Sequence, residues 1–192
     1  MKKLILSKGL VLAIIFVVTV DCLAQKNTVL IAYHSVSGHT AKMAKSIQKG
    51  ILESSDIKVI LKPVNEVSLQ ELFAADAIVI GSPVYNANPS PEILSFIKSW
   101  PFEGQPLKNK LGAVFVTAGG LSSGEELVQS SLLHAMMVYG MIVMGGDDWK
   151  SSFGASGIHE EGRYQSTELD EYFLDKGFRL GKRVAEVLKK MN

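Results

Sequence analysis

Short apolar runs alternate with longer amphipathic segments from residue 27 to the end of the chain. Five runs, apolar on both faces, predict strands at 28–34, 57–62, 77–81, 111–117 and 141–145. Segments whose apolar residues recur every three or four positions predict helices at 39–52, from Ser68, at 91–100, at 124–139 and at 167–190. Strands that are apolar on both faces and separated by helices indicate a parallel sheet covered on both sides.

Several local signals support these helices. Ser68 is followed three positions later by Glu71, which is the pattern of a capping box. Ser90 precedes Pro91 at a helix start, where a missing N–H costs nothing. The last helix is expected to bury Leu169, Tyr172, Phe173, Leu180, Val184 and Val187. Right-handed crossovers then predict a doubly wound α/β fold: one five-stranded parallel sheet of order 2-1-3-4-5 with helices on both faces.

The first 24 residues differ from the rest of the chain. Three lysines precede an apolar run from Gly9 to Val18, and Cys22-Leu23-Ala24 stands before Gln25. This pattern predicts a secretory signal peptide at 1–24, a single domain at 25–192 and an exported, periplasmic protein. The apolar run is shorter than the roughly 20 residues of a spanning helix. An uncleaved membrane anchor and lipidation of Cys22 are the alternatives.

Charge and cysteine content exclude several classes of function. The 192 residues carry a net charge of +1, and without residues 1–24 the charge is −1. No basic stripe indicates a nucleic-acid partner. The only cysteine is Cys22, so the processed domain would have neither a disulfide nor a Cys-ligated metal. We predict no metal site.

The turn after the first predicted strand favours an anion. It reads Ser35-Val36-Ser37-Gly38-His39-Thr40 and leads directly into a helix. Hydroxyls, a glycine and the positive end of a helix can hold a phosphate without a lysine. A polar turn that merely caps the helix is the simpler interpretation of this motif alone.

Two further turns are expected beside this one, at the edge of the sheet where the parallel strands have their carboxyl ends. Ligands of doubly wound sheets bind at that edge. After the third strand, Pro83-Val84-Tyr85-Asn86 offers an aromatic ring and an amide to a planar ligand. After the fourth, Thr117-Ala118-Gly119-Gly120-Leu121-Ser122 lets a ligand lie against the backbone. An exposed tyrosine in a turn and serine capping of the next helix are the alternatives.

The third turn also matches the G-x-S-x-G motif of hydrolases. Ser122 stands at the nucleophile position, and Asp147 and His159 follow in the order of a catalytic triad. Against a hydrolase, the chain is short for that fold and contains no H-G-G-G segment. We therefore treat this motif as a weak alternative.

Taken in order, these motifs resemble the flavodoxin-like superfamily and, within it, the tryptophan-repressor-binding-protein-like NAD(P)H:quinone oxidoreductases. The resemblance covers nearly all of residues 27–190. The matching segments are Tyr33–Thr40, Gly81–Pro83, Gly119–Glu126, Tyr139–Val143, Phe153–Ser156, Gly162-Arg163, Glu168-Leu169 and Gly177.

The resemblance implies an FMN held by residues 35–40, flanked by residues 83–86 and covered at its other edge by residues 117–122. It further implies electron transfer from NAD(P)H to a quinone or similar small acceptor. A homo-oligomer stays open, because the loops after the second and fifth predicted strands are shorter than those that help to build that family's oligomer. Tyr139 stands where that family usually has a histidine near the flavin, and is the one candidate catalytic residue. If the protein is exported, a membrane or periplasmic redox partner is an alternative donor. A flavodoxin-type electron carrier and a flavin-free binding module remain the rival functions.

Overall fold

The computed structural model describes residues 27–54, 56–166 and 168–191. The predicted signal peptide lies outside the described residues. Within those three ranges, no helix has the length and apolarity needed to cross a membrane.

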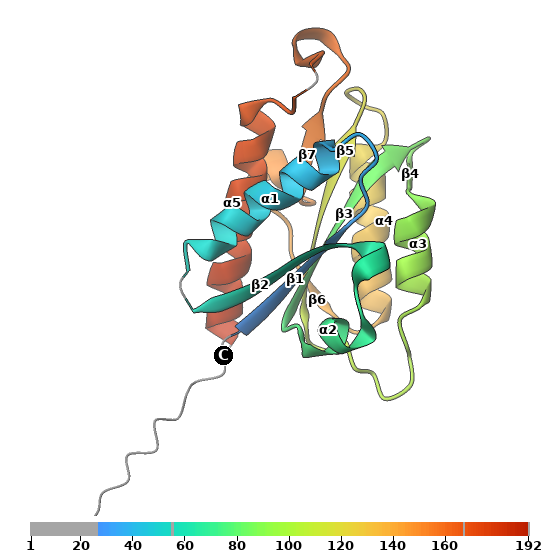
Figure 1. The fold of residues 1–192 in the computed structure, drawn as a ribbon, viewed down its shortest axis with the longest axis vertical. Coiled ribbons are helices and arrows are strands. Elements are labelled where there is room, and N and C mark those ends of the chain that lie inside the picture. The colour runs from blue at the N-terminus through green and yellow to red at the C-terminus, as the bar shows by residue number, and fades with distance from the viewer. Residues whose placement is uncertain (1–26, 55, 167, 192) are drawn as a thin grey trace, which may run out of the picture.

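One sheet lies between two layers of helices (Figure 1). Its strands are β1 (Asn27–Tyr33), β2 (Ile57–Pro63), β3 (Ala77–Tyr85), β4 (Asn88–Pro89), β5 (Leu111–Ala118), β6 (Ile142–Val143) and β7 (Ala155–Ile158). The helices are α1 (His39–Leu52), α2 (Leu69–Ala74), α3 (Pro91–Lys98), α4 (Glu125–Val138) and α5 (Glu171–Met191). The described residues also form three short 3₁₀ helices: η1 (Val64–Glu66), η2 (Trp149–Ser151) and η3 (Gly162–Tyr164).

The sheet has the predicted doubly wound topology. The strand order is β2-β1-β3-β5-β6, and these neighbours are parallel. The predicted number of five strands is wrong, because the sheet contains seven. Both additional strands arise at the edge formed by the carboxyl ends of the strands, which we call the carboxyl edge.

The first addition is a short hairpin. β3 continues four residues past the predicted end at Gly81 and turns back antiparallel as β4. Asn86 and Ala87 form the turn with φ of 50° and 59°. Two successive left-handed residues match the right-handed twist of the flanking strands. Residues 83–85 of the turn predicted at 83–86 are therefore an extension of β3.

The second addition comes from a split fifth strand. β6 pairs with Leu111 and Gly112, whereas β7 pairs with β5 from Phe115 to Ala118. The chain leaves the sheet between them and returns at Gly154, whose φ is +130°. A Cβ at Gly154 would lie 2.1 Å from the Val114 carbonyl oxygen. The prediction of one strand at 141–145 therefore found only the first half of this strand.

Both faces of the sheet are buried, as the sequence pattern predicted. In β1, Val29 and Ile31 pack into the core beneath α1 and α5. Leu30 and Ala32 point to the opposite core, which α2, α3 and α4 cover. The two-residue period of a strand thus supplies both cores from one apolar run.

Helices α1 and α5 cross at glycines. A Cβ on Gly50 would lie 2.0 Å from the Phe178 carbonyl oxygen, and one on Gly181 would lie 2.1 Å from the Ile47 carbonyl oxygen. Backbone therefore packs against backbone, without side chains between the helices. This contact fixes α1, whose amino end lies at the carboxyl edge.

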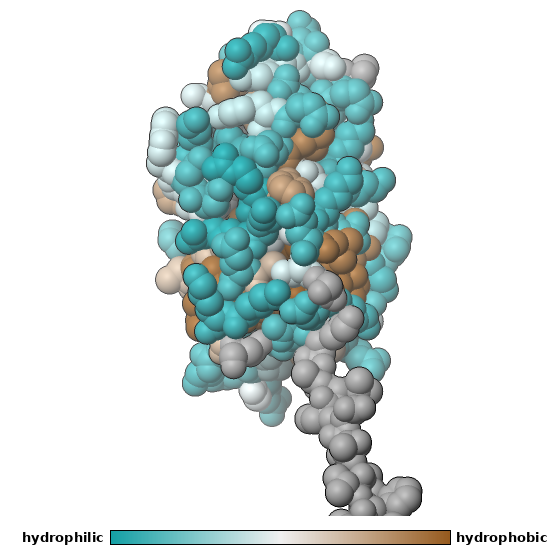
Figure 2. All heavy atoms as spheres, turned by 90° about the vertical axis from the view of Figure 1, so that its left-hand side faces the viewer, coloured by the Kyte–Doolittle hydropathy of each residue, from teal (hydrophilic) through white to brown (hydrophobic). Residues whose placement is uncertain are grey.

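Local predictions around the helices were mostly correct. The Ser68–Glu71 capping box is present, and Ser90 caps α3 with Pro91 in its first turn. α5 begins at Glu171, and Leu169 is buried just before it. Tyr172 was expected to be buried but is 46% exposed. Figure 2 shows the side of the molecule that carries α5, and it is mostly hydrophilic with hydrophobic atoms in small patches.

The α1–α5 crossing gives a stability test. Alanine normally favours a helix over glycine by about 1 kcal/mol, but Gly181→Ala forces the two backbones apart. We expect it to lower the free energy of unfolding in urea by about 1–3 kcal/mol. The exposed change Glu186→Ala on the same helix should alter it by less than about 0.5 kcal/mol. A stabilising Gly181→Ala would contradict the close crossing.

Candidate functional site

The turn between β1 and α1 presents backbone donors at the carboxyl edge. Gly38 is the N-cap of α1 and has a left-handed φ of 93°, with nothing within 4 Å of the position of a Cβ. The N–H groups of His39 and Thr40 lie in the first turn, where no preceding helical carbonyl reaches them. The first turn contains no acidic residue, so this helix end can accept an anion.

A buried hydrogen bond joins this turn to the end of β5. The Oγ1 atoms of Thr40 and Thr117 lie 2.8 Å apart, and each residue is only 2% exposed. Because neither hydroxyl reaches bulk water, each depends on the other for its hydrogen bond. The pair fixes the first turn of α1 relative to the third predicted turn.

The β3–β4 hairpin forms a second wall. The Ser90 N–H donates to Ser82 Oγ at 2.9 Å, and that hydroxyl donates to the Pro83 carbonyl oxygen at 2.7 Å. Both serines are fully buried. The hydrogen bonds close the base of the hairpin and leave Tyr85 and Asn86 exposed near its tip.

A fourth segment, which the sequence reasoning did not include, lies against the glycine turn. The His159 N–H donates to the Ala118 carbonyl oxygen at 3.3 Å, and the Glu160 N–H donates to that of Gly119 at 2.9 Å. Glu161 Oε2 accepts the Leu121 N–H at 2.5 Å. The segment after β7 stands above the sheet at the top of Figure 1. It holds the glycine turn, and the Leu121 N–H is already bonded.

These four segments enclose a cavity of about 330 Å³, which we call the edge cavity. It is lined by Val36, Ser37, Thr40, Pro83, Val84, Tyr85, Thr117, Ala118, Gly119, His159 and Glu160. Nine of these belong to the predicted site, and His159 and Glu160 are additional. The volume lies within the range of small-molecule sites.

The remaining predicted residues surround the edge cavity without lining it. Ser35 accepts the Ala41 N–H at 3.3 Å, and both Ser35 and Gly38 line a neighbouring cavity of about 440 Å³. Asn86 lies at the hairpin turn. Gly120, Leu121 and Ser122 follow Gly119 in the third turn. That turn is not capped by its serines, because Gly124 is the N-cap of α4.

His39, in the turn at residues 35–40, stacks on His159 from the segment after β7. The rings of His39 and His159 have centroids 3.9 Å apart and lie within 11° of parallel. His39 is 7% exposed, and its Nδ1 lies 2.8 Å from Ser37 Oγ. Burial and the neighbouring His39 lower the pKa of His159, while the Glu160 carboxylate partly opposes that shift. The stack brings together residues 120 positions apart.

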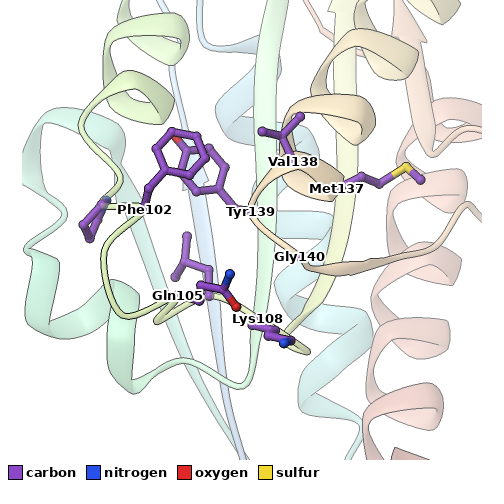
Figure 3. A pocket seen from close by; sticks show the side chains of 9 residues that line it. Phe102, Gln105, Lys108, Met137, Val138, Tyr139 and Gly140 are labelled. Carbon is purple, nitrogen blue, oxygen red and sulfur yellow. The ribbon is translucent and has the colours of Figure 1, made fainter.

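Tyr139 is not part of the edge cavity of its own chain. Its hydroxyl donates to the Ile97 carbonyl oxygen at 3.1 Å, and its ring stacks on Phe102 at 4.4 Å (Figure 3). It precedes Gly140, whose carbonyl oxygen accepts the Asn109 N–H just before β5 begins. The length of β5, about 25 Å at 3.3 Å per residue, separates this region from Thr117. The structure therefore places Tyr139 away from the edge cavity, and its catalytic role stays a prediction.

The hydrolase triad is not assembled. Asp147 accepts a hydrogen bond from Arg179 at 2.6 Å, and His159 stacks on His39. A catalytic triad requires the Asp carboxylate to accept a hydrogen bond from the His ring. Asp147 and His159 have these other partners instead.

The fold and the edge cavity define a flavodoxin-like protein. A crystal structure of a WrbA-like flavodoxin from Agrobacterium tumefaciens superimposes with a TM-score of 0.71 at 21% identity, covering 86% of this chain and 99% of the other. A flavodoxin structure from the domain Archaea superimposes with a TM-score of 0.65 at 26% identity, covering 84% and 99%.

Sequence comparison identifies the family. Residues 24–156 match the family model for NADPH-dependent FMN reductases, and the chain belongs to that family. It is 31% identical to a flavodoxin of Clostridium saccharobutylicum over 163 residues, 84% of this chain and 97% of the relative. It is 28% identical to an NAD(P)H dehydrogenase (quinone) of Archaeoglobus fulgidus over 192 aligned positions, covering 85% and 98%. The protein is therefore an oxidoreductase of a family that uses FMN and NAD(P)H.

The threonine pair gives a test of the site's architecture. Thr117→Val keeps the shape of the side chain but leaves the buried Thr40 hydroxyl without its partner. We expect a loss of about 1–3 kcal/mol in the free energy of unfolding, measured in urea. The double change Thr40→Val/Thr117→Val should cost less than the sum of the single changes, because no unpaired hydroxyl remains. Additive losses would show that the two hydroxyls do not depend on each other.

Proposed function

We propose that this protein holds one FMN in the edge cavity and passes electrons from NAD(P)H to a quinone or a similar small acceptor. The observation that carries the proposal is the meeting, in one cavity, of an anion-accepting helix end and exposed apolar side chains. Val36 is 78% exposed and Tyr85 is 41% exposed at this cavity. A phosphate attached to a flat aromatic ring needs both features.

The residues present fit FMN. Ser37 and Thr40, which line the edge cavity, would hold the phosphate. Ser35, Gly38 and His39 of the same turn would add hydroxyl and N–H donors beside it. His39 Nε2 is buried and has no hydrogen-bond partner among the described residues, so it can bond a polar ligand. Residues 83–86 would flank the ring, and residues 117–122 would cover its other edge.

Bound FMN supplies the two-electron chemistry, accepting from a nicotinamide and donating to the acceptor. The protein's own part is to bind, orient and shield. Thr40 and Thr117 lock the phosphate turn to β5, and the hairpin serines hold Tyr85 beside it.

An electron carrier is the second candidate, and the flavodoxin relatives favour it. A carrier would bind FMN and yet oxidise neither NADH nor NADPH with a quinone. Turnover of either nucleotide with a benzoquinone, in the presence of the bound flavin, separates the two functions.

The phosphate turn can be tested with a matched glycine pair. Gly38 and Gly104 both have left-handed φ angles, 93° and 72°, and open space around a Cβ. Alanine is strained at either position by about 1–2 kcal/mol, but only Gly38 lies beside the edge cavity. By fluorescence titration, we expect Gly38→Ala to raise the Kd for FMN about tenfold, and Gly104→Ala to leave it unchanged. A wild-type chain that takes up no FMN would overturn the proposal.

We also propose that the protein is exported, on the strength of the pattern in residues 1–24. Expression in a bacterial host followed by mass spectrometry of the product should give a chain beginning at Gln25. A product that retains residues 1–24 in the cytoplasmic fraction would contradict export.

A further inference from the structure

The edge cavity contains no permanent cation for a phosphate. None of the described residues that line it is Lys or Arg, and His159 is the lining side chain that can become positive near neutral pH. Lys42 lies in the first turns of α1, but it is paired with Glu168. A phosphate dianion in this cavity would therefore meet N–H dipoles and hydroxyls, with imidazole as the available source of positive charge.

The stacked imidazoles lie so close together that only one of the two is expected to carry a proton charge at a time. At 3.9 Å between ring centroids, protonation of one ring strongly disfavours protonation of the other. His39 bonds Ser37 through Nδ1 and has an unpartnered, buried Nε2. His159 has Glu160 Oε1 at 3.5 Å from its Nδ1. The pair can therefore carry one positive charge, and the Glu160 carboxylate would stabilise that charge on His159.

Without an anion, the surroundings of His159 favour its neutral form. Burial and His39 lower the pKa of His159, and Glu160 offsets only part of that effect. A dianion in the edge cavity opposes this effect, because its negative charge favours the protonated form of the His159 imidazole that lines the cavity.

We propose that the His39–His159 stack is a proton-linked phosphate contact, so that FMN binding is accompanied by uptake of one proton from solvent. The inference rests on the proposed function, since it takes the edge cavity to be the FMN site. It assigns His159, which follows a strand that the sequence pattern missed, to the recognition of the phosphate.

Other ionisable groups lie in the elements around the stack, and none substitutes for it. On the segment after β7 they are Glu160, Glu161, Arg163 and Tyr164; on α1, Lys42; before α5, Glu168; and on β3, Tyr85. Glu161 is bonded to the Leu121 N–H, and Arg163 donates to the Tyr164 hydroxyl at 2.6 Å. The two nearest carboxylates would weaken phosphate binding if the imidazoles stayed neutral.

The sign of the pH dependence follows from linkage. A group whose pKa is higher in the complex than in the free protein strengthens binding at low pH. That contribution is lost as the pH rises through the pKa in the complex. The phosphate of FMN titrates near pH 6, as phosphate monoesters do, and is a dianion above pH 7. Between pH 7 and 8.5, uptake of one proton predicts a rise in the Kd for FMN that approaches tenfold per pH unit.

The test is calorimetric titration of the full chain at pH 7.5 in two buffers of different ionisation enthalpy. The difference in heat gives the number of protons taken up. We expect a value approaching one proton with FMN and close to zero with riboflavin, which has the same ring without the phosphate. His159→Gln should reduce the FMN value to near zero, and the exposed change His134→Gln on α4 should leave it unaltered.

The outcomes separate this inference from the proposed function. FMN binding without proton uptake in the wild-type chain would overturn the inference and leave the proposed function intact. Equal uptake with riboflavin would overturn it as well, because the proton would then belong to the ring. A chain that binds no FMN in either buffer would overturn both. The wild-type comparison needs no variant, so it stands even if His159→Gln fails to fold.

Discussion

Parallel pairing delivers the carboxyl ends of β1, β3, β5 and β7 to a single edge of the sheet, and the whole candidate site depends on that constraint. Turns that lie far apart in sequence meet there because the strands that precede them are paired in parallel. The buried Thr40–Thr117 hydrogen bond then fixes the distance between the first and third turns. The glycine crossing of α1 and α5 holds α1 against the sheet. The anion-accepting helix end is positioned by backbone packing.

The electrostatics of the edge cavity follow from the residues that line it. Among the described lining residues there is neither Lys nor Arg, so the phosphate of the proposed FMN would meet dipoles, hydroxyls and imidazole. Glu160 and Glu161 brace the glycine turn and bring negative charge close to the same place. The stacked histidines balance that charge only when protonated. The segment after β7 thus holds the glycine turn and, in the proposed FMN complex, also supplies the imidazole that meets the phosphate.

Sequence alone predicted five of the seven strands, their order and three of the four segments around the edge cavity. These succeeded because each follows an apolar run long enough to predict a strand. The fourth segment was missed because the chain leaves the sheet between β6 and β7, which leaves only Ala155–Ile158 as a strand. The sequence signal for this segment is the short run Ala155–Ile158, which directly precedes His159 and pairs with β5 in the structure. Tyr139 lies away from the edge cavity, although the family resemblance implied a position near the flavin. The direction of the helix before it explains this. α4 runs against the strands, so its carboxyl end lies at the opposite edge.

The most direct measurement is an NMR titration of the isotopically labelled full chain with FMN, following every backbone amide. The account predicts that the largest shifts occur in residues 35–40, 83–86, 117–121 and 159–160. Amides around Phe102 and Tyr139 should move little. Shifts concentrated around Phe102 and Tyr139, or spread evenly over the chain, would contradict the placement of the flavin at the carboxyl edge.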